Sequence, residues 1–317
     1  MTPRTSDMFF MTMADGAKLR AKFMVNPRGG HRGTIVMLPG NSSFIEKFDP
    51  VEVMIEANHF NFFCFDWRGQ GSSHRQLLDP NKSHIDHFGI YVSDLARIME
   101  NYVLPLGSQP VYFLAESMGG NIALRYLSQH ASPVKALILA APMLGILTAP
   151  YPWSMAKWIA KATCWAGFAT SYALGQRPLR PYTLPFETND LSTYRDLYYR
   201  VREYQFMNPH LVNSGVTWGW LKAAMESVDV ILKDIDWGSF SIPVLLALSG
   251  REGVVDNQKA LQWSQKISRC RVRYYPDAAH LIMGEKPEIL ANFWQDINVF
   301  LADTEESSAE RRIVEST

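Results

Sequence analysis

The chain has 317 residues, which is enough for one large α/β domain or two smaller ones. Its 47% hydrophobic and 20% charged residues are typical of a soluble globular protein. Its formal net charge is zero, which argues against nucleic acid as the main partner.

The first part of the chain alternates strands with helices after a hairpin. Two extended runs within residues 9–25 flank Asp15-Gly16, a dipeptide that favours a tight hairpin turn. Continuous apolar runs then predict strands that are buried on both faces of a parallel sheet. These strands are expected at 34–38, 62–65, 111–114 and 136–139, with helices near 88–95 and 118–129.

The alternation resumes near the C-terminus. Strands are expected at 244–248 and 271–275, and helices at 258–266 and 287–301. Strands and helices in this order predict an α/β fold with a mostly parallel, doubly wound sheet. The polar residues 304–317 are expected to form a flexible tail.

The segment 143–238 interrupts this alternation. It holds six of the nine tryptophans and seven of the thirteen tyrosines, and its pattern indicates helices and loops without clear strands. An insertion at this point would lie over the carboxyl ends of the strands, where α/β sheets bind ligands. We therefore expect a helical cap at 143–238 between two parts of one core, 1–142 and 239–303.

A serine stands at the turn between a predicted strand and a predicted helix. The sequence Ala115-Glu-Ser117-Met-Gly119 places small residues two positions before and after Ser117, as a nucleophile elbow requires. The usual first residue of this pattern is glycine, so Ala115 makes the match a near one. The surrounding strand and helix favour a nucleophile over a simple serine-glycine turn.

A serine nucleophile needs a base, and His280 is the best placed of the eight histidines. It follows the strand at 271–275 by a short loop, from which an imidazole can reach a serine on a central strand. His84 and His87 have helix-like spacing, but no third ligand accompanies them. Polar residues that open a helix explain this pair better than a metal site does, and we expect no metal.

Two carboxylates compete to orient the histidine. Glu252 lies four residues beyond the strand at 244–248, and Asp256 stands where an aspartate would cap the next helix. We favour Glu252 as the acid and keep Asp256 as the alternative. The expected oxyanion hole uses the N–H of Met118, after the nucleophile, and that of Asn41, beside Gly40. Asp66 and Arg68 are expected to fix the turn that precedes Ser72.

Together these residues resemble an α/β-hydrolase of the lysophospholipase and monoacylglycerol lipase family, with closest likeness to bacterial lysophospholipases of the inner-membrane type. The resemblance covers about residues 34–301. It is carried by Leu-Pro-Gly40, Asp-Trp-Arg-Gly-Gln-Gly-Ser72, Ala-Glu-Ser-Met-Gly-Gly120, Ala-Ala-Pro-Met143, the Glu252 loop and Ala-Ala-His280, and further by 77–80, 184–186 and 254–257. It implies an α/β-hydrolase fold with the catalytic serine, acid and histidine at Ser117, Glu252 and His280. Two departures are Ala115 for glycine and Pro39 for the histidine of a His-Gly pair.

The resemblance implies a serine ester hydrolase that acts on a lipid-like monoacyl ester without metal or organic cofactor. Lysophospholipid is the favoured substrate and monoacylglycerol the next. A general carboxylesterase or an acyltransferase would use the same residues, and a noncatalytic binding protein with this fold is a third, weaker alternative. An epoxide or haloalkane hydrolase is disfavoured because it would carry aspartate in place of Ser117.

The cap sequence also suggests contact with a membrane surface. Trp158 and Trp165 share one helical face, with Lys157 and Lys161 beside it, a pattern suited to a headgroup interface. The alternative is that these tryptophans pack the cap onto the core. Three scattered cysteines, the lack of a signal-peptide pattern and the lack of a spanning apolar run predict a cytoplasmic protein, peripheral at most to the inner face of the membrane.

Overall fold

The computed structural model describes residues 6–28, 32–107, 110–178, 185–213 and 215–315, with side chains described up to residue 306. Its centre is an eight-stranded sheet with the order β1-β2-β4-β3-β6-β7-β9-β10. β2 pairs antiparallel with β1 and β4, and every other pair is parallel. The strands are β1 (Ser6–Thr12), β2 (Lys18–Met24), β3 (Thr34–Leu38), β4 (Asn61–Phe65), β6 (Val111–Glu116), β7 (Val134–Ala140), β9 (Val244–Arg251) and β10 (Cys270–Ala279).

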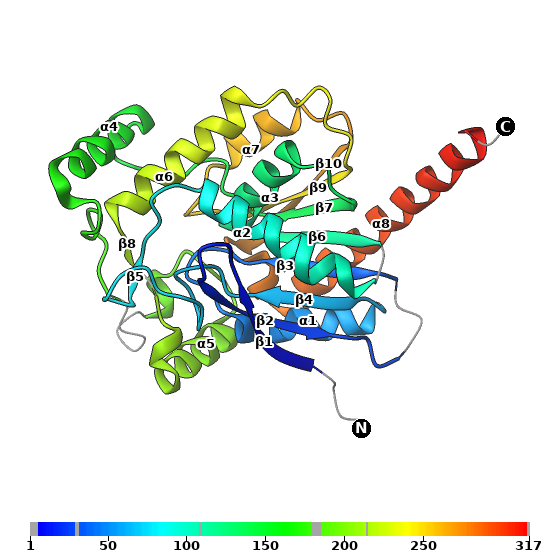
Figure 1. The fold of residues 1–317 in the computed structure, drawn as a ribbon, viewed down its shortest axis with the longest axis horizontal. Coiled ribbons are helices and arrows are strands. Elements are labelled where there is room, and N and C mark those ends of the chain that lie inside the picture. Colours follow the sequence, from blue (N-terminus) through cyan, green and yellow to red (C-terminus); the bar gives the residue numbers. More distant parts are fainter. Residues whose placement is uncertain (1–5, 29–31, 108–109, 179–184, 214, 316–317) are drawn as a thin grey trace.

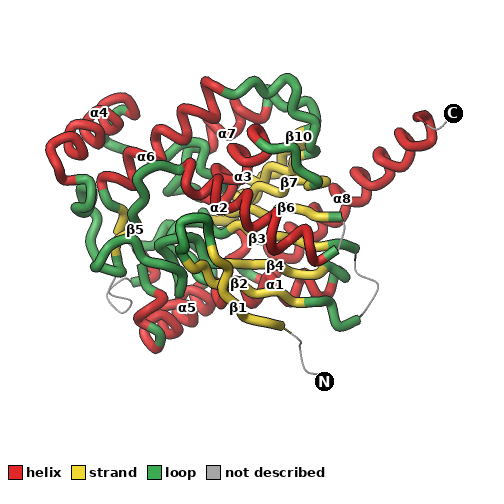
Figure 2. Tube along the Cα trace, viewed as in Figure 1, coloured by secondary structure: helices red, strands yellow, loops and turns green. Residues whose placement is uncertain are grey.

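Helices flank both faces of this sheet (Figures 1 and 2). The helices of the core are α1 (Asp49–Ala57), α2 (Gly89–Ile98), α3 (Met118–Gln129), α7 (Asn257–Ser264) and α8 (Pro287–Glu315). Short helical turns, η1 (Ile45–Phe48), η2 (Met99–Val103), η3 (Leu104–Leu106) and η9 (Ile282–Gly284), complete them. β3, β4 and β6 are buried along their whole length. The predicted mostly parallel, doubly wound α/β architecture is confirmed.

The helices between β7 and β9 all lie within residues 143–238, the segment for which a cap was predicted. They are α4 (Trp153–Thr163), η4 (Cys164–Phe168), η6 (Phe186–Thr188), α5 (Arg195–Met207), η7 (Pro209–Leu211), α6 (Trp218–Asp229) and η8 (Val230–Asp234). α4 packs against α6, whereas α5 lies apart from both (Figure 1). The segment also holds a two-residue strand, β8 (Gly215–Val216), which pairs with β5 (Lys82–Ser83) in the loop after β4. The expectation of no strands there missed this pairing, because two residues leave no periodic pattern.

The expected flexible tail at 304–317 is corrected by the structure. α8 continues through this segment to Glu315, and its end projects away from the rest of the molecule (Figure 1). The segment is polar, but it is rich in residue types with high helix propensity, so an existing helix can continue through it. The polar composition of residues 304–315 was therefore not a sign that the helix ends before them.

The turn after β4 is fixed as the sequence predicted. The buried Asp66 carboxylate accepts hydrogen bonds from the Ile45 N–H (2.9 Å) and the Ser72 N–H (2.8 Å), and it pairs with Arg20 (2.7 Å). Arg68 pairs with Asp94 at 2.8 Å. Asp66 therefore ties this turn to the loop that follows β3, the two loops that border the candidate site.

No helix in the described part of the chain combines the length and apolar character needed to cross a membrane.

Candidate active site

Ser117 occupies a strained turn between β6 and α3. Its φ of 51° and ψ of −113° lie outside the usual region for a residue with a side chain, as the sharp reversal at a nucleophile elbow requires. A Cβ on Gly119 would lie 2.0 Å from the Leu38 carbonyl oxygen, so only glycine fits two positions after the serine. Ala115, two positions before it, is fully buried in β6. The predicted elbow is present with alanine in place of the usual glycine.

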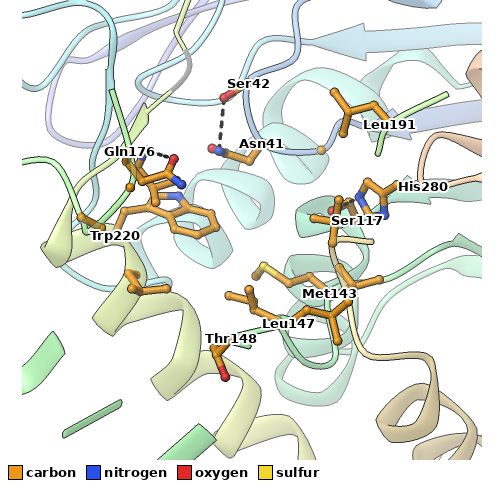
Figure 3. Close-up of a pocket in the computed structure, with 18 of the residues that line it drawn as sticks. Asn41, Ser42, Ser117, Met143, Leu147, Thr148, Gln176, Leu191, Trp220 and His280 are labelled. Atoms are coloured by element: carbon orange, nitrogen blue, oxygen red, sulfur yellow. Dashed lines mark hydrogen bonds between the residues drawn. The ribbon is translucent and has the colours of Figure 1, made fainter. Parts of the chain in front are cut away.

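Ser117, His280 and Glu252 form one hydrogen-bonded chain. The His280 Nε2 lies 3.0 Å from the Ser117 Oγ, and its Nδ1 lies 2.9 and 3.0 Å from the two Glu252 carboxylate oxygens. Ser117 and His280 face each other at the edge of the cavity in Figure 3. His280 directly follows β10, which runs on to Ala279, four residues beyond the strand end expected from the sequence. The structure thus brings together three residues that are 28 and 135 positions apart in the chain.

Glu252 is held as a carboxylate. Burial alone would raise its pKa, but hydrogen bonds from His280, from the Ser249 hydroxyl (2.6 Å) and from the Val255 N–H (3.1 Å) bring the pKa below its ordinary value. A carboxylate can only accept hydrogen bonds, so the Nδ1 of His280 carries the proton in this pair. The Nε2 is then free to accept the hydrogen bond of the Ser117 hydroxyl.

Asp256, the alternative acid, makes different contacts. Its side chain accepts hydrogen bonds from the Gln258 N–H (3.0 Å) and the Lys259 N–H (3.2 Å) at the start of α7. These are the contacts of a helix N-cap, the structural role that the sequence predicted for it. The carboxylate that bonds to the His280 ring is therefore that of Glu252 and not that of Asp256.

The loop after β3 passes directly beside the elbow. A Cβ on Gly40 would lie 3.4 Å from the Ser117 Cβ, so the backbone approaches Ser117 closely. The next residue, Asn41, lines the cavity, and its side-chain oxygen accepts a hydrogen bond from the Ser83 hydroxyl at 3.1 Å. Trp67 Nε1 donates to the Pro39 carbonyl at 2.9 Å. The loop that carries Asn41 is thus fixed on both sides of Gly40.

A cavity of about 890 Å³ lies over Ser117 and His280, within the size range of small-molecule sites. The segment 143–238 supplies most of its walls: Ala156 and Ile159 from α4, Arg202 and Gln205 from α5, and Trp218, Trp220 and Leu221 from α6. Trp220 lies across the cavity from Ser117 and His280 in Figure 3, and Leu147 lies beside Met143. A cap was predicted for this segment, but these lining residues were not. The density of tryptophan was the available signal, and it could not show which rings face inward.

His84 lies away from this chain of residues. Its Nδ1 is 2.8 Å from the Thr217 hydroxyl, and burial lowers its pKa, which favours the neutral ring. Within the described residues, no three His, Cys, Asp or Glu side chains come close enough together to hold a metal ion. α2 begins at Gly89, two residues after His87, so the pair precedes the helix and does not open it.

Comparison with known proteins identifies the family. The family model described as serine aminopeptidase, S33, matches residues 29–287. The chain belongs to this family of serine hydrolases. Within the family it is 30% identical to lysophospholipase L2 of Escherichia coli K12 over 286 residues, which are 90% of this chain and 80% of that protein. Probable lysophospholipase L2 of Haemophilus influenzae is 25% identical over 90% of this chain and 88% of its own. Human monoglyceride lipase is 19% identical over 93% of this chain and 90% of its own.

Solved structures of other hydrolases share the fold. A soluble variant of monoglyceride lipase from Saccharomyces cerevisiae, in complex with a substrate analog, superposes with a TM-score of 0.75 at 16% identity, over 96% of this chain and 97% of that one. A thermostable carboxyl esterase from Bacillus coagulans superposes with a TM-score of 0.74 at 14% identity, over 95% of this chain and 99% of that one. The predicted resemblance to lysophospholipases and monoacylglycerol lipases is confirmed, and so is the expectation of an ester hydrolase with an α/β-hydrolase fold.

Proposed function

We propose that this S33-family hydrolase releases a fatty acid from a monoacyl lipid, with lysophospholipid favoured over monoacylglycerol. The observation that carries the proposal is the hydrogen-bonded chain from Ser117 through His280 to Glu252 beneath a large cavity. The names of the similar bacterial proteins point to lysophospholipid, and that of the human relative points to monoacylglycerol.

In the proposed reaction the Ser117 Oγ attacks the ester carbonyl carbon while the His280 Nε2 takes the hydroxyl proton. Glu252 stabilises the imidazolium that forms. His280 then gives the proton to the leaving glycerol oxygen, and the acyl group remains on Ser117. A water molecule that loses its proton to His280 attacks this acyl-enzyme, and the fatty acid leaves with Ser117 restored.

The Met118 and Asn41 N–H groups are the proposed donors to the oxyanion. Met118 is the first residue of α3, so its N–H belongs to the group of N-terminal amides that have no acceptor within the helix. Asn41 follows Gly40, whose backbone approaches Ser117 closely. Donors held in place before the reaction stabilise the charge that develops in the transition state without reorganisation.

The segment 143–238 is proposed as a cap that holds the acyl chain. Apolar side chains from the loop after β7, from α4, from the segment after η4 and from α6 line part of the cavity: Ile146, Leu147, Ile159, Leu174, Trp218 and Leu221. Burial of a hydrocarbon chain against such a wall contributes about 0.8 kcal/mol per methylene group. A single long acyl chain therefore matches this wall better than a short polar ester does.

We further propose that α4 rests on a bilayer. Trp158 and Trp165 are 69% and 92% exposed, so they do not pack the cap onto the core. Lys157 pairs with Asp229 and Lys161 lies 3.5 Å from Glu226, both on α6, so these lysines hold α4 to α6. Ala156 and Ile159 on the same helix line the cavity. Trp158 on α4 and Trp165 on η4 thus face outward, while apolar side chains of α4 face inward, as a path for one acyl chain requires.

The double variant Trp158→Ala, Trp165→Ala is expected to bind anionic liposomes less tightly and to lose turnover of long-chain substrates dispersed in them, by about tenfold for the loss of two inserted rings. Hydrolysis of a short p-nitrophenyl ester should stay near the wild-type rate. Liposome co-sedimentation and the two activity assays measure this. The matched control is Phe10→Ala, Tyr274→Ala, which removes two aromatic rings, 56% and 60% exposed, that lie outside the cap. Equal losses on long and short esters would contradict a membrane role.

The proposed substrate class is tested with lysophospholipids and monoacylglycerols of the same acyl chain and with short p-nitrophenyl esters. Free fatty acid should be released from the lysophospholipid with the highest kcat/KM, followed by the monoacylglycerol. Faster hydrolysis of short p-nitrophenyl esters than of either lipid would favour a general carboxylesterase. Transfer of the acyl group to added glycerol in preference to water would favour an acyltransferase. We place this activity in the cytoplasm at the inner face of the membrane, in keeping with three free cysteines.

A further inference from the structure

Two positive side chains and one negative side chain line the same part of the active-site cavity. The charged side chains among its described lining residues are Lys47, Glu116 and Arg202. The Lys47 ammonium lies 3.5 Å from the Glu116 carboxylate and 3.1 Å from the Ser43 hydroxyl. Arg202 has no carboxylate partner in the described part of the chain. The three charges therefore leave this end of the cavity with a net positive charge.

The cap helix α5 brings Arg202 to this place. The ring of Tyr204 stacks on that of Phe44 with centroids 5.8 Å apart, which holds α5 against the loop that leads into η1 and Lys47. The Arg202 guanidinium lies 4.9 Å from the Tyr198 ring centroid, and one of its terminal nitrogens donates to the Gln205 Oε1 at 2.9 Å. The guanidinium is therefore fixed in direction before any ligand arrives.

Gln205 adds a second unmatched donor. Its side chain is 4% exposed and lines the cavity, and its oxygen accepts the hydrogen bond from Arg202. The amide nitrogen thus keeps two N–H donors, and neither has an acceptor among the described residues. The Arg202 Nε has no acceptor either, and this atom is buried. A donor left unmatched in a buried place carries a large free-energy cost, so the Arg202 Nε and the free Gln205 amide favour an anion that accepts several hydrogen bonds.

We propose that Arg202 and Gln205, together with Lys47, bind the phosphate of a lysophospholipid headgroup. This inference rests on the proposed function, and it identifies the residues that would favour a lysophospholipid over a monoacylglycerol. A planar guanidinium matches two phosphate oxygens at once, which a neutral glycerol hydroxyl cannot reproduce. In a lysophospholipid the phosphate and the ester share one glycerol, so both must fit the cavity that holds Ser117. The acyl chain then takes the apolar side beneath α4 and α6.

The test uses two ether lipids that have no carbonyl for Ser117 to attack, 1-O-decyl-glycero-3-phosphocholine and 1-O-decylglycerol, below their critical micelle concentrations. Isothermal titration of the full-length wild type should give at least about tenfold tighter binding of the phosphate lipid, the effect of about one charge-assisted hydrogen bond. Arg202→Gln should bring the two dissociation constants close to each other. Arg202→Lys keeps the charge without the planar fork and should keep part of the preference.

Arg200→Gln is the matched control, because Arg200 is exposed on the same helix. It lines neither the cavity over Ser117 nor a second, smaller pocket that lies beside Lys47. It should keep the wild-type preference. The inference would be overturned if the wild type bound both lipids equally, or if Arg202→Gln kept the preference, or if Arg200→Gln lost as much as Arg202→Gln. Failure of the proposed function has a different result: no ester is hydrolysed, while the preference for the phosphate lipid still depends on Arg202.

Discussion

Ser117→Ala and His280→Ala are each expected to lower kcat by about 10³-fold or more, because the two side chains act as one unit in the attack on the ester. The Ser117 Oγ and the His280 Nε2 are 3.0 Å apart, so loss of either leaves no nucleophile or no base. The double variant should be no slower than the slower single variant. Steady-state hydrolysis of a lysophospholipid and of a short p-nitrophenyl ester measures all three enzymes.

A fluorophosphonate probe provides an independent measurement of the same pair. It should label the wild type, fail to label Ser117→Ala and label His280→Ala slowly, because the probe needs an activated serine. Ser128→Ala is the matched control, since this serine lies on α3, the helix that follows Ser117, and donates to the Arg125 carbonyl away from the cavity. Near-normal turnover in Ser117→Ala or His280→Ala, with thermal unfolding unchanged, would show that the nucleophile or the base is a different residue.

The sheet and the elbow could be predicted because their patterns are local. Strands buried on both faces of a parallel sheet show as continuous apolar runs, and β3, β4, β6, β7 and β9 all contain the predicted ones. The turn at Ser117 needs small residues at fixed offsets, and Gly119 satisfies a contact with Leu38 that only glycine allows. His280 could be found because it follows the last strand of the sheet.

The sequence predicted helices within residues 143–238, but it could not predict how they pack. Trp158 and Trp165 share a helical face whether that face is buried or exposed, so helical spacing alone could not decide between the two interpretations. The partners of Lys157 and Lys161 lie on α6, 72 and 65 residues further along the chain. Such pairing depends on how two distant helices meet, and no local pattern encodes it. The same holds for Arg202, which lies on α5, where Tyr204 stacks on Phe44 of a distant loop.

Glu252→Gln is expected to lower kcat by about 10³-fold, because an amide carries no charge to stabilise the His280 imidazolium and one end of it is a donor. The Glu252 oxygens now accept from His280, from the Ser249 hydroxyl and from the N–H groups of Val254 and Val255. An amide cannot accept all of these bonds. Asp256→Ala, by contrast, should cost about 1 kcal/mol of stability through the lost cap of α7 and leave kcat near wild type.

The pH dependence of unfolding separates an ionised Glu252 from a merely well-packed one. Its folded-state pKa lies below its ordinary value of 4.5, so the charged form stabilises the native state above that pH. This contribution is lost as the pH falls through the lowered pKa. Chemical denaturation should therefore find Glu252→Gln less stable than the wild type at pH 7, with the difference shrinking in acid. A difference that stays constant from pH 7 to below the folded-state pKa would indicate a packing defect. An inactive Asp256→Ala with an active Glu252→Gln would assign the acid to Asp256.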